Sequence, residues 1–103
     1  MIARLWKGWT PLSNGDAYEL LLRDHILPGI HRLAGFQGAY ILRQDGETET
    51  EFVIVTLFNS LDDVRAFAGD SYTTPVIEPE ARALLSRFEN FASHYDIKLS
   101  PAE

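Results

Sequence analysis

The sequence predicts an α+β fold of the ferredoxin-like kind, a split β-α-β sandwich with a four-stranded antiparallel sheet. The main observation is a pattern that occurs twice, in which a β-rich apolar run leads into a Ser-x-x-Asp helix start. The apolar runs cover residues 2–10 and 51–59, and the helix starts cover residues 13–16 and 60–63. Each helix is followed by another strand-like run, so the chain divides into two strand–helix–strand halves.

Composition agrees with one globular domain, expected at residues 1–99 with a tail at 100–103. The chain has 103 residues, and a hydrophobic share of 46% is too high for a disordered protein. Its net charge of −6 and lack of cysteine argue against nucleic-acid binding, disulfides and cysteine-bound metals. No apolar run is long enough for a membrane span and no signal-peptide pattern is present, so the expected location is cytoplasmic.

In the first half, a strand is expected at residues 1–10, where β-branched and aromatic residues are dense, and Pro11 ends it. Ser13 is expected to cap the following helix. Pro28 should break or kink that helix, because proline lacks the N–H of the helical bond. A second strand is expected at residues 36–43. The buried face of the helix should carry Ala17, Leu20, Leu21 and Leu27.

In the second half, Asp45-Gly46 predicts a tight turn into a third strand at residues 50–59. Ser60 should start a helix that Gly69 ends, as a C-terminal glycine commonly does. A short helix should begin at Pro79, and the last strand is expected at residues 88–99. The apolar face of the Ser60 helix comprises Leu61, Val64, Phe67 and Ala68.

The third predicted strand is apolar on both of its faces. Alternation places Phe52, Ile54 and Phe58 on one face and Val53, Val55 and Leu57 on the other. The two helices of the chain can cover only one face, and a solvated face would carry polar residues. Three exposed aliphatic side chains would forgo several kcal/mol at ~25 cal/mol per Å². We therefore expect a homodimer in which two sheets pack face to face.

The three histidines lack the spacing of a metal site, because no two are four residues apart and no carboxylate cluster accompanies them. His25 and His31 flank Pro28 and are expected at the surface or an interface. His94 lies in the last strand, where two interpretations stay open. It is either a hydrogen-bonded structural histidine or a base in a ligand pocket.

Two tryptophans and one polar pair complete the candidates. Trp6 and Trp9 lie on opposite faces of the first strand, so one should face the helices and the other the partner. A tryptophan in a helix–sheet cavity could stack on a flat ligand, although core packing is the simpler explanation. Tyr72 and Arg87 could reach the mouth of such a pocket, although Arg87 is equally well explained as a surface charge.

Four blocks of the sequence resemble the antibiotic biosynthesis monooxygenase superfamily. They are Ile-Ala-Arg-Leu-Trp-Lys-Gly at 2–8, Gly-Ala-Tyr-Ile-Leu-Arg at 38–43, Phe-x-x-x-Thr-Leu-Phe-Asn-Ser-Leu-Asp-Asp-Val-Arg-Ala-Phe-Ala-Gly at 52–69 and His-Tyr-Asp-Ile at 94–97. The blocks occur in the right order over almost the whole chain, and residues 57–69 are the most distinctive. The resemblance implies a dimeric α+β barrel, in agreement with the doubly apolar sheet.

The resemblance also implies oxidation of a small phenolic or quinol-type aromatic by O₂, with no metal or flavin cofactor. The deprotonated substrate would supply the electrons, and the protein would bind a planar ring in a dry pocket and stabilise the anion. Family members with assigned sites use an aromatic residue, a tyrosine and an arginine at or near the places of Phe67, Tyr72 and Arg87. The expected site has His94, Tyr72 and Arg87 as catalytic residues and Trp6 and Phe67 as substrate-binding residues.

Two alternatives follow from the same family. The haem-degrading branch uses Asn, Trp and His, whereas this chain has no Asn in the first strand, Phe67 in place of the Trp and Ile77 near the place of the His. Haem degradation is therefore disfavoured. The second alternative is a non-catalytic dimer that binds a small ligand or serves in stress responses. It predicts a closed or filled cavity, whereas an enzyme predicts an open pocket with His94 or Tyr72 exposed inside.

Overall fold

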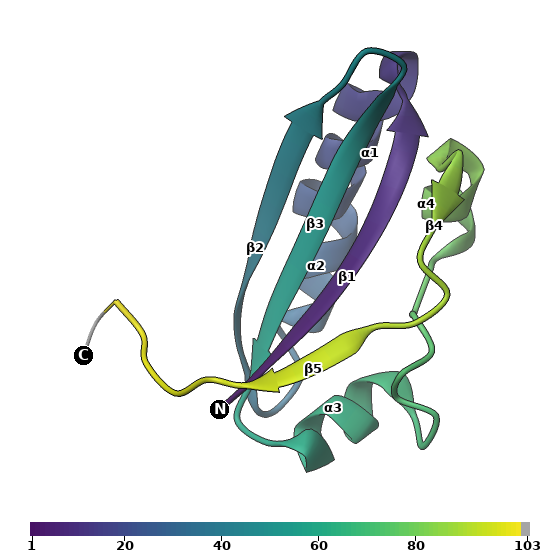
Figure 1. The fold of residues 1–103 in the computed structure, drawn as a ribbon. Coiled ribbons are helices and arrows are strands. Elements are labelled where there is room, and N and C mark those ends of the chain that lie inside the picture. Colours follow the sequence, from purple (N-terminus) through teal and green to yellow (C-terminus); the bar gives the residue numbers. More distant parts are fainter. Residues whose placement is uncertain (102–103) are drawn as a thin grey trace.

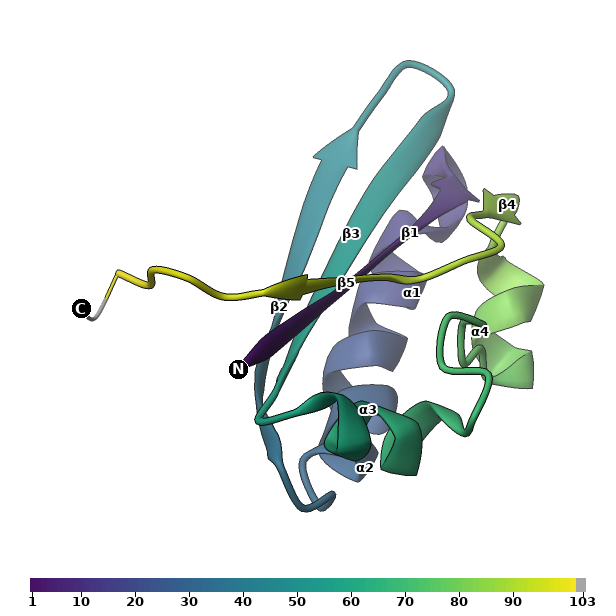
Figure 2. The ribbon, with the colours of Figure 1, turned by 60° about the horizontal axis from the view of Figure 1, so that its bottom comes forward.

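The structure, a computed structural model that describes residues 1–101, is an α+β sandwich of one antiparallel sheet and one layer of helices (Figures 1 and 2). The strands are β1 (Ile2–Pro11), β2 (Phe36–Asp45), β3 (Glu49–Phe58), β4 (Arg87–Phe88) and β5 (Ser93–Asp96). Strand β1 is central, with β3 and then β2 on one side and β4 and β5 on the other. This arrangement confirms the predicted ferredoxin-like fold.

The helices cover one face of the sheet (Figure 2). They are the 3₁₀ turn η1 (Leu12–Asn14), α1 (Gly15–Leu21), the π-helical turn η2 (Leu22–Ile26), α2 (Leu27–Ile30), α3 (Leu61–Ala68) and α4 (Pro79–Leu84). Pro28 lies in the first turn of α2, so the predicted break is instead a change of helix type just before it. Proline has no backbone N–H and cannot donate an α-helical hydrogen bond, and the π turn changes the hydrogen-bonding pattern just before it. No helix of residues 1–101 has the length and apolar character needed to span a bilayer.

The helix-start signals are confirmed in the second half and wrong in the first. The Ser60 side chain accepts a hydrogen bond from the backbone N–H of Asp63 at 3.3 Å, and Gly69 ends α3 with φ +87°. Ser13 instead lies in η1 and makes no side-chain cap bond. Pro11 continues β1 up to this 3₁₀ turn, and the turn delays the start of α1 until Gly15.

The predicted buried face of the first helix is also wrong in part. Tyr18 and Leu22 are buried, at 1% and 4% exposure, whereas Ala17 and Leu20 face solvent. The Tyr18 ring packs edge-on against Phe52 of the sheet, with 4.8 Å between ring centroids. A large aromatic ring in the core sets the rotation of the helix, and this turns the smaller apolar side chains outward.

The last predicted strand is split into β4 and β5, so the sheet has five strands rather than four. Between them, the Trp6 indole donates to the carbonyl of Glu89 at 2.8 Å. The N–H of Ala92 donates to the carbonyl of Thr73 at 2.7 Å. The backbone between β4 and β5 therefore bonds to the Trp6 side chain and to the loop at Thr73, and its pairing with β1 is interrupted there. Of the predicted tail, residues 102 and 103 lie outside the described residues.

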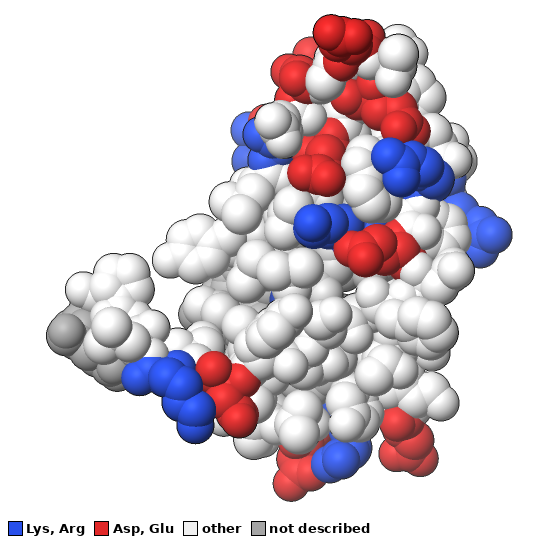
Figure 3. All heavy atoms as spheres, viewed as in Figure 1, with Lys and Arg blue, Asp and Glu red and all other residues white. Residues whose placement is uncertain are grey.

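The two faces of the sheet have different surroundings. Phe52 and Phe58 are fully buried against the helices, so of the two predicted faces of β3 it is this one that the helices cover. No helix of the described chain covers the opposite face, named the open face below (Figure 1). Figure 3 shows an uncharged area over the lower part of this face and charged side chains of both signs toward the hairpin that joins β2 and β3. Its side chains include Tyr40, Leu42, Val53, Val55 and Leu57. In this single chain Tyr40 is 59% and Leu42 is 50% exposed, whereas Val53, Val55 and Leu57 are half-buried.

Candidate functional site

A cavity of about 70 Å³ lies between the helices and the inner face of the sheet. One water molecule needs only roughly 10–15 Å³ by the same kind of measure, so the cavity can admit part of a ligand. Most of its wall is apolar. The wall comes from β1, β3, the continuous helix formed by α1, η2 and α2, α3 and the loop before α4. The wall includes Trp6, Leu22, Ile26, Ile54, Phe67 and Ile77.

A wider cleft of about 480 Å³ lies next to this cavity. The cleft and the cavity share the wall residues Ile26, Ile30, Phe67, Val76 and Glu78. The cleft runs between α2 and the start of α4. A ligand can therefore approach the cavity from solvent along this route.

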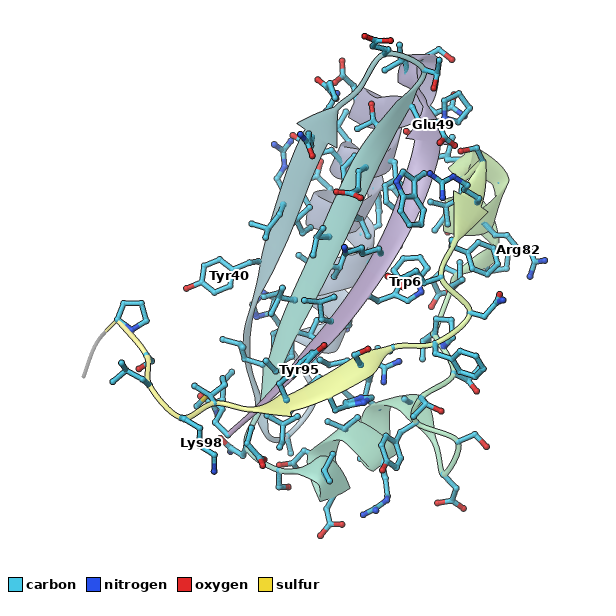
Figure 4. All side chains as sticks on the ribbon, viewed as in Figure 1. Trp6, Tyr40, Glu49, Arg82, Tyr95 and Lys98 are labelled. Atoms are coloured by element: carbon cyan, nitrogen blue, oxygen red, sulfur yellow. The ribbon has the colours of Figure 1, made fainter. Side chains whose placement is uncertain are left out.

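The two residues predicted to bind a substrate both line the cavity. Trp6 projects inward from β1 and is 9% exposed, and its indole N–H is used by the Glu89 carbonyl (Figure 4). Phe67 comes from α3 and stacks on Phe58, with 5.7 Å between ring centroids and 29° between the planes. The cavity therefore has aromatic surfaces on both its sheet side and its helix side.

Arg4 also lines the cavity, and it is only 5% exposed. Its Nη1 donates to the carbonyl of Tyr72 and to Nε2 of His94, the latter at 3.0 Å, and its Nη2 donates to the carbonyl of Thr74 at 3.1 Å. The guanidinium lies 5.6 Å from the centroid of Phe67. Among the described residues, no carboxylate forms an ion pair with Arg4.

His94 and Tyr72 lie together beside Arg4 and are not among the wall residues of the cavity. Their rings meet edge to face with 5.1 Å between centroids. Since arginine only donates, Nε2 of His94 accepts and the ring proton is on Nδ1. Burial, together with the nearby charge of Arg4, lowers the pKa of His94 below its ordinary value. His94 is therefore neutral, and its Nε2 lone pair is already occupied.

Arg87 belongs to β4 and pairs with Trp9 of β1, whereas His94 of β5 pairs with Arg4 of β1. The structure therefore does not bring Arg87 together with Tyr72 and His94. Its guanidinium lies 3.9 Å from the ring centroid of Trp9, on the other side of the sheet from Trp6. Its Nε donates to the Glu49 carboxylate at 3.0 Å, near the hairpin that joins β2 and β3 (Figure 4). This contact explains its position without a ligand.

Tyr18 is a second polar residue of the cavity that the sequence analysis did not single out. It lines the wall from α1, and within residues 1–101 its hydroxyl has no hydrogen-bond partner. Burial raises the pKa of Tyr18 far above its ordinary value, so the hydroxyl stays protonated and can donate.

The sequence does contain a signal for Arg4. Arg4 lies between Ile2 and Trp6 on the inward face of β1, where an arginine interrupts two apolar side chains. A charge at such a position is unusual, because buried arginine is rare without a partner. Tyr18 has no comparable signal, since an amphipathic helix can rotate toward either of two adjacent apolar stripes. No group of three potential metal-binding side chains occurs in the described part of the chain.

Comparison with solved structures gives a fold match for the whole chain. A crystal structure from Bacillus cereus, named as a candidate antibiotic biosynthesis monooxygenase, aligns with a TM-score of 0.64 and 14% sequence identity. The alignment covers 99% of this chain and 97% of that one. No family model and no curated protein matches the sequence. At this identity the likeness shows a shared fold.

Proposed function

We propose, starting from this shared fold, that the protein is a cofactor-independent monooxygenase that oxidises a small phenolic or quinol-type aromatic with O₂. The observation that carries the proposal is the apolar cavity with aromatic walls, which adjoins an outer cleft. A flat ring that enters from the cleft would lie against Trp6 on the sheet side and Phe67 on the helix side. An apolar enclosure of this kind also excludes water from a reactive anion.

In the proposed reaction the ionised substrate reduces O₂. One oxygen atom enters the ring and the other leaves as water. In an anthrone, a ring CH₂ and O₂ give C=O and H₂O, and a hydroquinone with a free ring C–H and O₂ give a hydroxyquinone and H₂O. The substrate supplies all of the electrons, and the protein has to bind, orient and shield it. Trp6 and Phe67 would hold the plane of the ring. His94 reaches the cavity wall through its hydrogen bond to Arg4, and Tyr72 lies beside His94. Arg87 contacts Glu49 and Trp9, which are not among the wall residues of the cavity.

We also propose that the protein is a homodimer with the open faces packed against each other. The open face carries a row of exposed or half-buried apolar residues, and Tyr95 of β5 extends that row at 56% exposure (Figure 4). After β5 the chain runs away from the sheet, and Leu99 is 78% exposed (Figure 1). A stable interface needs about 800 Å² per partner, which a face of several strands can supply.

Sedimentation at several protein concentrations tests this assembly. The wild-type protein should sediment as a dimer, and Val55→Arg, which puts a charge in the centre of the open face, should be a monomer. Leu20→Arg, at an exposed position on the helix side, is the matched control and should remain a dimer. A wild-type monomer at micromolar concentration would contradict the proposal.

The non-catalytic alternative keeps one observation in its favour. The enclosed part of the cavity is much smaller than a ligand pocket of ~300–1,000 Å³, and neither His94 nor Tyr72 lines it. In that case the protein would bind a small aromatic without converting it. Oxygen consumption separates this function from the first.

Oxygen uptake with a panel of anthrones and hydroquinones is the direct test. The expected result is one O₂ consumed for each oxygenated quinone formed, with water rather than hydrogen peroxide as the second product. Ile77→Trp, which fills the cavity, should lower kcat/KM by about tenfold or more, equivalent to at least 1.4 kcal/mol of transition-state stabilisation. Arg82→Ala, an exposed residue of α4, should leave kcat/KM unchanged. If no panel member is consumed faster than in buffer, the oxygenase proposal is wrong.

A further inference from the structure

We propose that Arg4 is an anion-binding residue of the cavity and that the ligand is held there as an aromatic oxyanion, a phenolate. The inference deepens the proposed function and rests on it for the location of the ligand, but not for the reaction with O₂. The cavity would then discriminate between the ionised and the neutral form of the same molecule.

The charge of Arg4 favours a negatively charged ligand. Its side chain is almost completely buried, and its hydrogen-bond partners are two backbone carbonyls and a neutral imidazole. A buried charge is costly unless an opposite charge or strong hydrogen bonds compensate it. These partners satisfy donors of Arg4 but bring no negative charge. Burial lowers the pKa of Arg4, yet a guanidinium stays charged in proteins.

The geometry of the remaining N–H donors of Arg4 favours the same kind of ligand. The contacts to Tyr72, His94 and Thr74 use three N–H groups and fix the plane of the guanidinium. The other N–H groups of the fork can serve a ligand oxygen, since Arg4 is part of the cavity wall. Tyr18 offers a second donor from the opposite, helical side of the same cavity. Fixed donors in an apolar enclosure stabilise an oxyanion more strongly than water does.

His94 is a positioning residue in this arrangement. Its Nε2 accepts from Nη1 of Arg4, so it holds the guanidinium without competing for the ligand's negative charge. A protonated imidazole at this place would repel Arg4. The charge of Arg4 also removes the need for a base in the cavity wall, because it favours the ionised ligand directly. The proton of the phenol then leaves to solvent through the cleft.

Glu78 supplies the opposing charge and makes the inference testable in both directions. It lines both the cavity and the cleft, and Glu80 lines the cleft farther out. Neither carboxylate pairs with an arginine among the described residues. If an anion binds at Arg4, removal of the Glu78 charge should strengthen its binding. A purely structural Arg4 predicts no such effect.

The probe is 4-nitrophenol, because its phenolate absorbs visible light and reports its own ionisation. The neutral control is 4-nitroanisole, in which a methyl group replaces the proton. The wild-type protein should bind nitrophenolate about tenfold or more tightly than nitroanisole, and the bound phenol should ionise at a pH about one unit or more below that in buffer.

Arg4→Gln should abolish the preference for nitrophenolate while nitroanisole still binds, which also shows that the variant is folded. Glu78→Gln should tighten nitrophenolate binding a few-fold and leave nitroanisole unchanged. His94→Gln, whose amide oxygen can still accept from Arg4, should keep the preference, whereas His94→Leu should weaken it.

The proposal is overturned if wild-type protein binds both probes equally, binds neither at millimolar concentration, or raises the pH at which the phenol ionises. It is also overturned if Glu78→Gln weakens nitrophenolate binding. Nitrophenolate binding in a protein that consumes no O₂ with the anthrone and hydroquinone panel would leave the anion site standing and remove the oxygenase function. Oxygen uptake by a protein without the phenolate preference would leave the oxygenase function standing and remove the anion site.

Discussion

Arg43 and Arg4 lie at opposite ends of the sheet and have opposite surroundings. At the hairpin end, Arg43 makes contacts of 2.9 Å with three carboxylates, those of Asp16, Glu19 and Asp45. At the β5 end, Arg4 contacts two carbonyls and an imidazole. The hydrogen bonds that Arg43 donates to the carboxylates, that to Asp45 foremost, raise the pKa of Arg43, whereas burial lowers the pKa of Arg4.

This difference separates two uses of the same side chain. The charge of Arg43 is neutralised by its own chain, and Figure 3 shows charged side chains of both signs at that end of the molecule. The charge of Arg4 has no counterpart in the described residues, although the site is more deeply buried. An exposed ion-pair network can form for surface structure alone. A buried lone cation beside an apolar cavity is better explained by a ligand.

The largest expected effect is on the free energy of unfolding, when arginine is replaced by glutamine at Arg4 and, for comparison, at Arg43. Arg4→Gln should lower the free energy of unfolding by about 2–3 kcal/mol, because the carbonyls of Tyr72 and Thr74 lose buried charged donors. Arg43→Gln should lower it less, because the Arg43 contacts are with exposed carboxylates. Urea denaturation of both variants, with m-values compared, measures the difference. Equal losses would remove the contrast between the two ends.

A smaller effect is expected when the pH falls, and it should come in two stages. The pKa of His94 is lowered in the folded state, so the unfolded state takes up protons first. Stability should therefore fall as the pH drops below about 6.5. At the hairpin end, the pKa values of Asp45 and Glu49 are also lowered. Their contribution is complete above about pH 4.5 and is lost as the pH falls through their lower folded values.

Urea midpoints measured between about pH 8 and pH 3 resolve the two stages. His94→Gln should remove only the upper stage, and Glu49→Gln should reduce only the lower one. A wild-type protein whose midpoint stays constant from neutral pH down to the carboxylate range would show that His94 has the same pKa in both states.

The smallest expected effect is that of salt. Raising NaCl to about 1 M shortens the screening length to about 3 Å and weakens exposed ion pairs. The stability difference between wild type and Arg43→Gln should therefore shrink, whereas the difference between wild type and Arg4→Gln should persist, because the Arg4 contacts are shielded from solvent ions. Parallel urea curves at low and high salt measure both differences. A shrinking Arg4→Gln difference would mean that salt reaches this site.

The fold could be predicted from the sequence because its signals are local. The doubled strand–helix pattern and the alternation in β3 depend only on neighbouring residues, and both are present in the structure. The split of the last strand depends on the bond from Trp6 to the Glu89 carbonyl, which joins residues far apart in the chain. No local pattern contains that information.

The site was predictable only in part, for the same reason. The inward direction of Trp6 follows from alternation, and Phe67 lies on the apolar face of its helix. The importance of Arg4 comes from what surrounds it in space, and a sequence does not show that its neighbours carry no carboxylate. Tyr72 and Arg87 were expected at the mouth of one pocket. In the structure Tyr72 lies beside His94, whereas Arg87 contacts Glu49 near the hairpin that joins β2 and β3.

The π turn η2 is one residue wider than an α-helical turn and supplies both Leu22 and Ile26 to the cavity wall. Deleting one residue from this turn would restore a regular α-helical turn, and the helix on either side would keep its face toward the sheet. The wall would then lose the extra width between Leu22 and Ile26, while the sheet and α3 would stay as they are. A single-codon deletion or insertion in this turn could therefore change the size of the cavity. Natural variation or protein engineering could change at this turn which ligands fit the cavity.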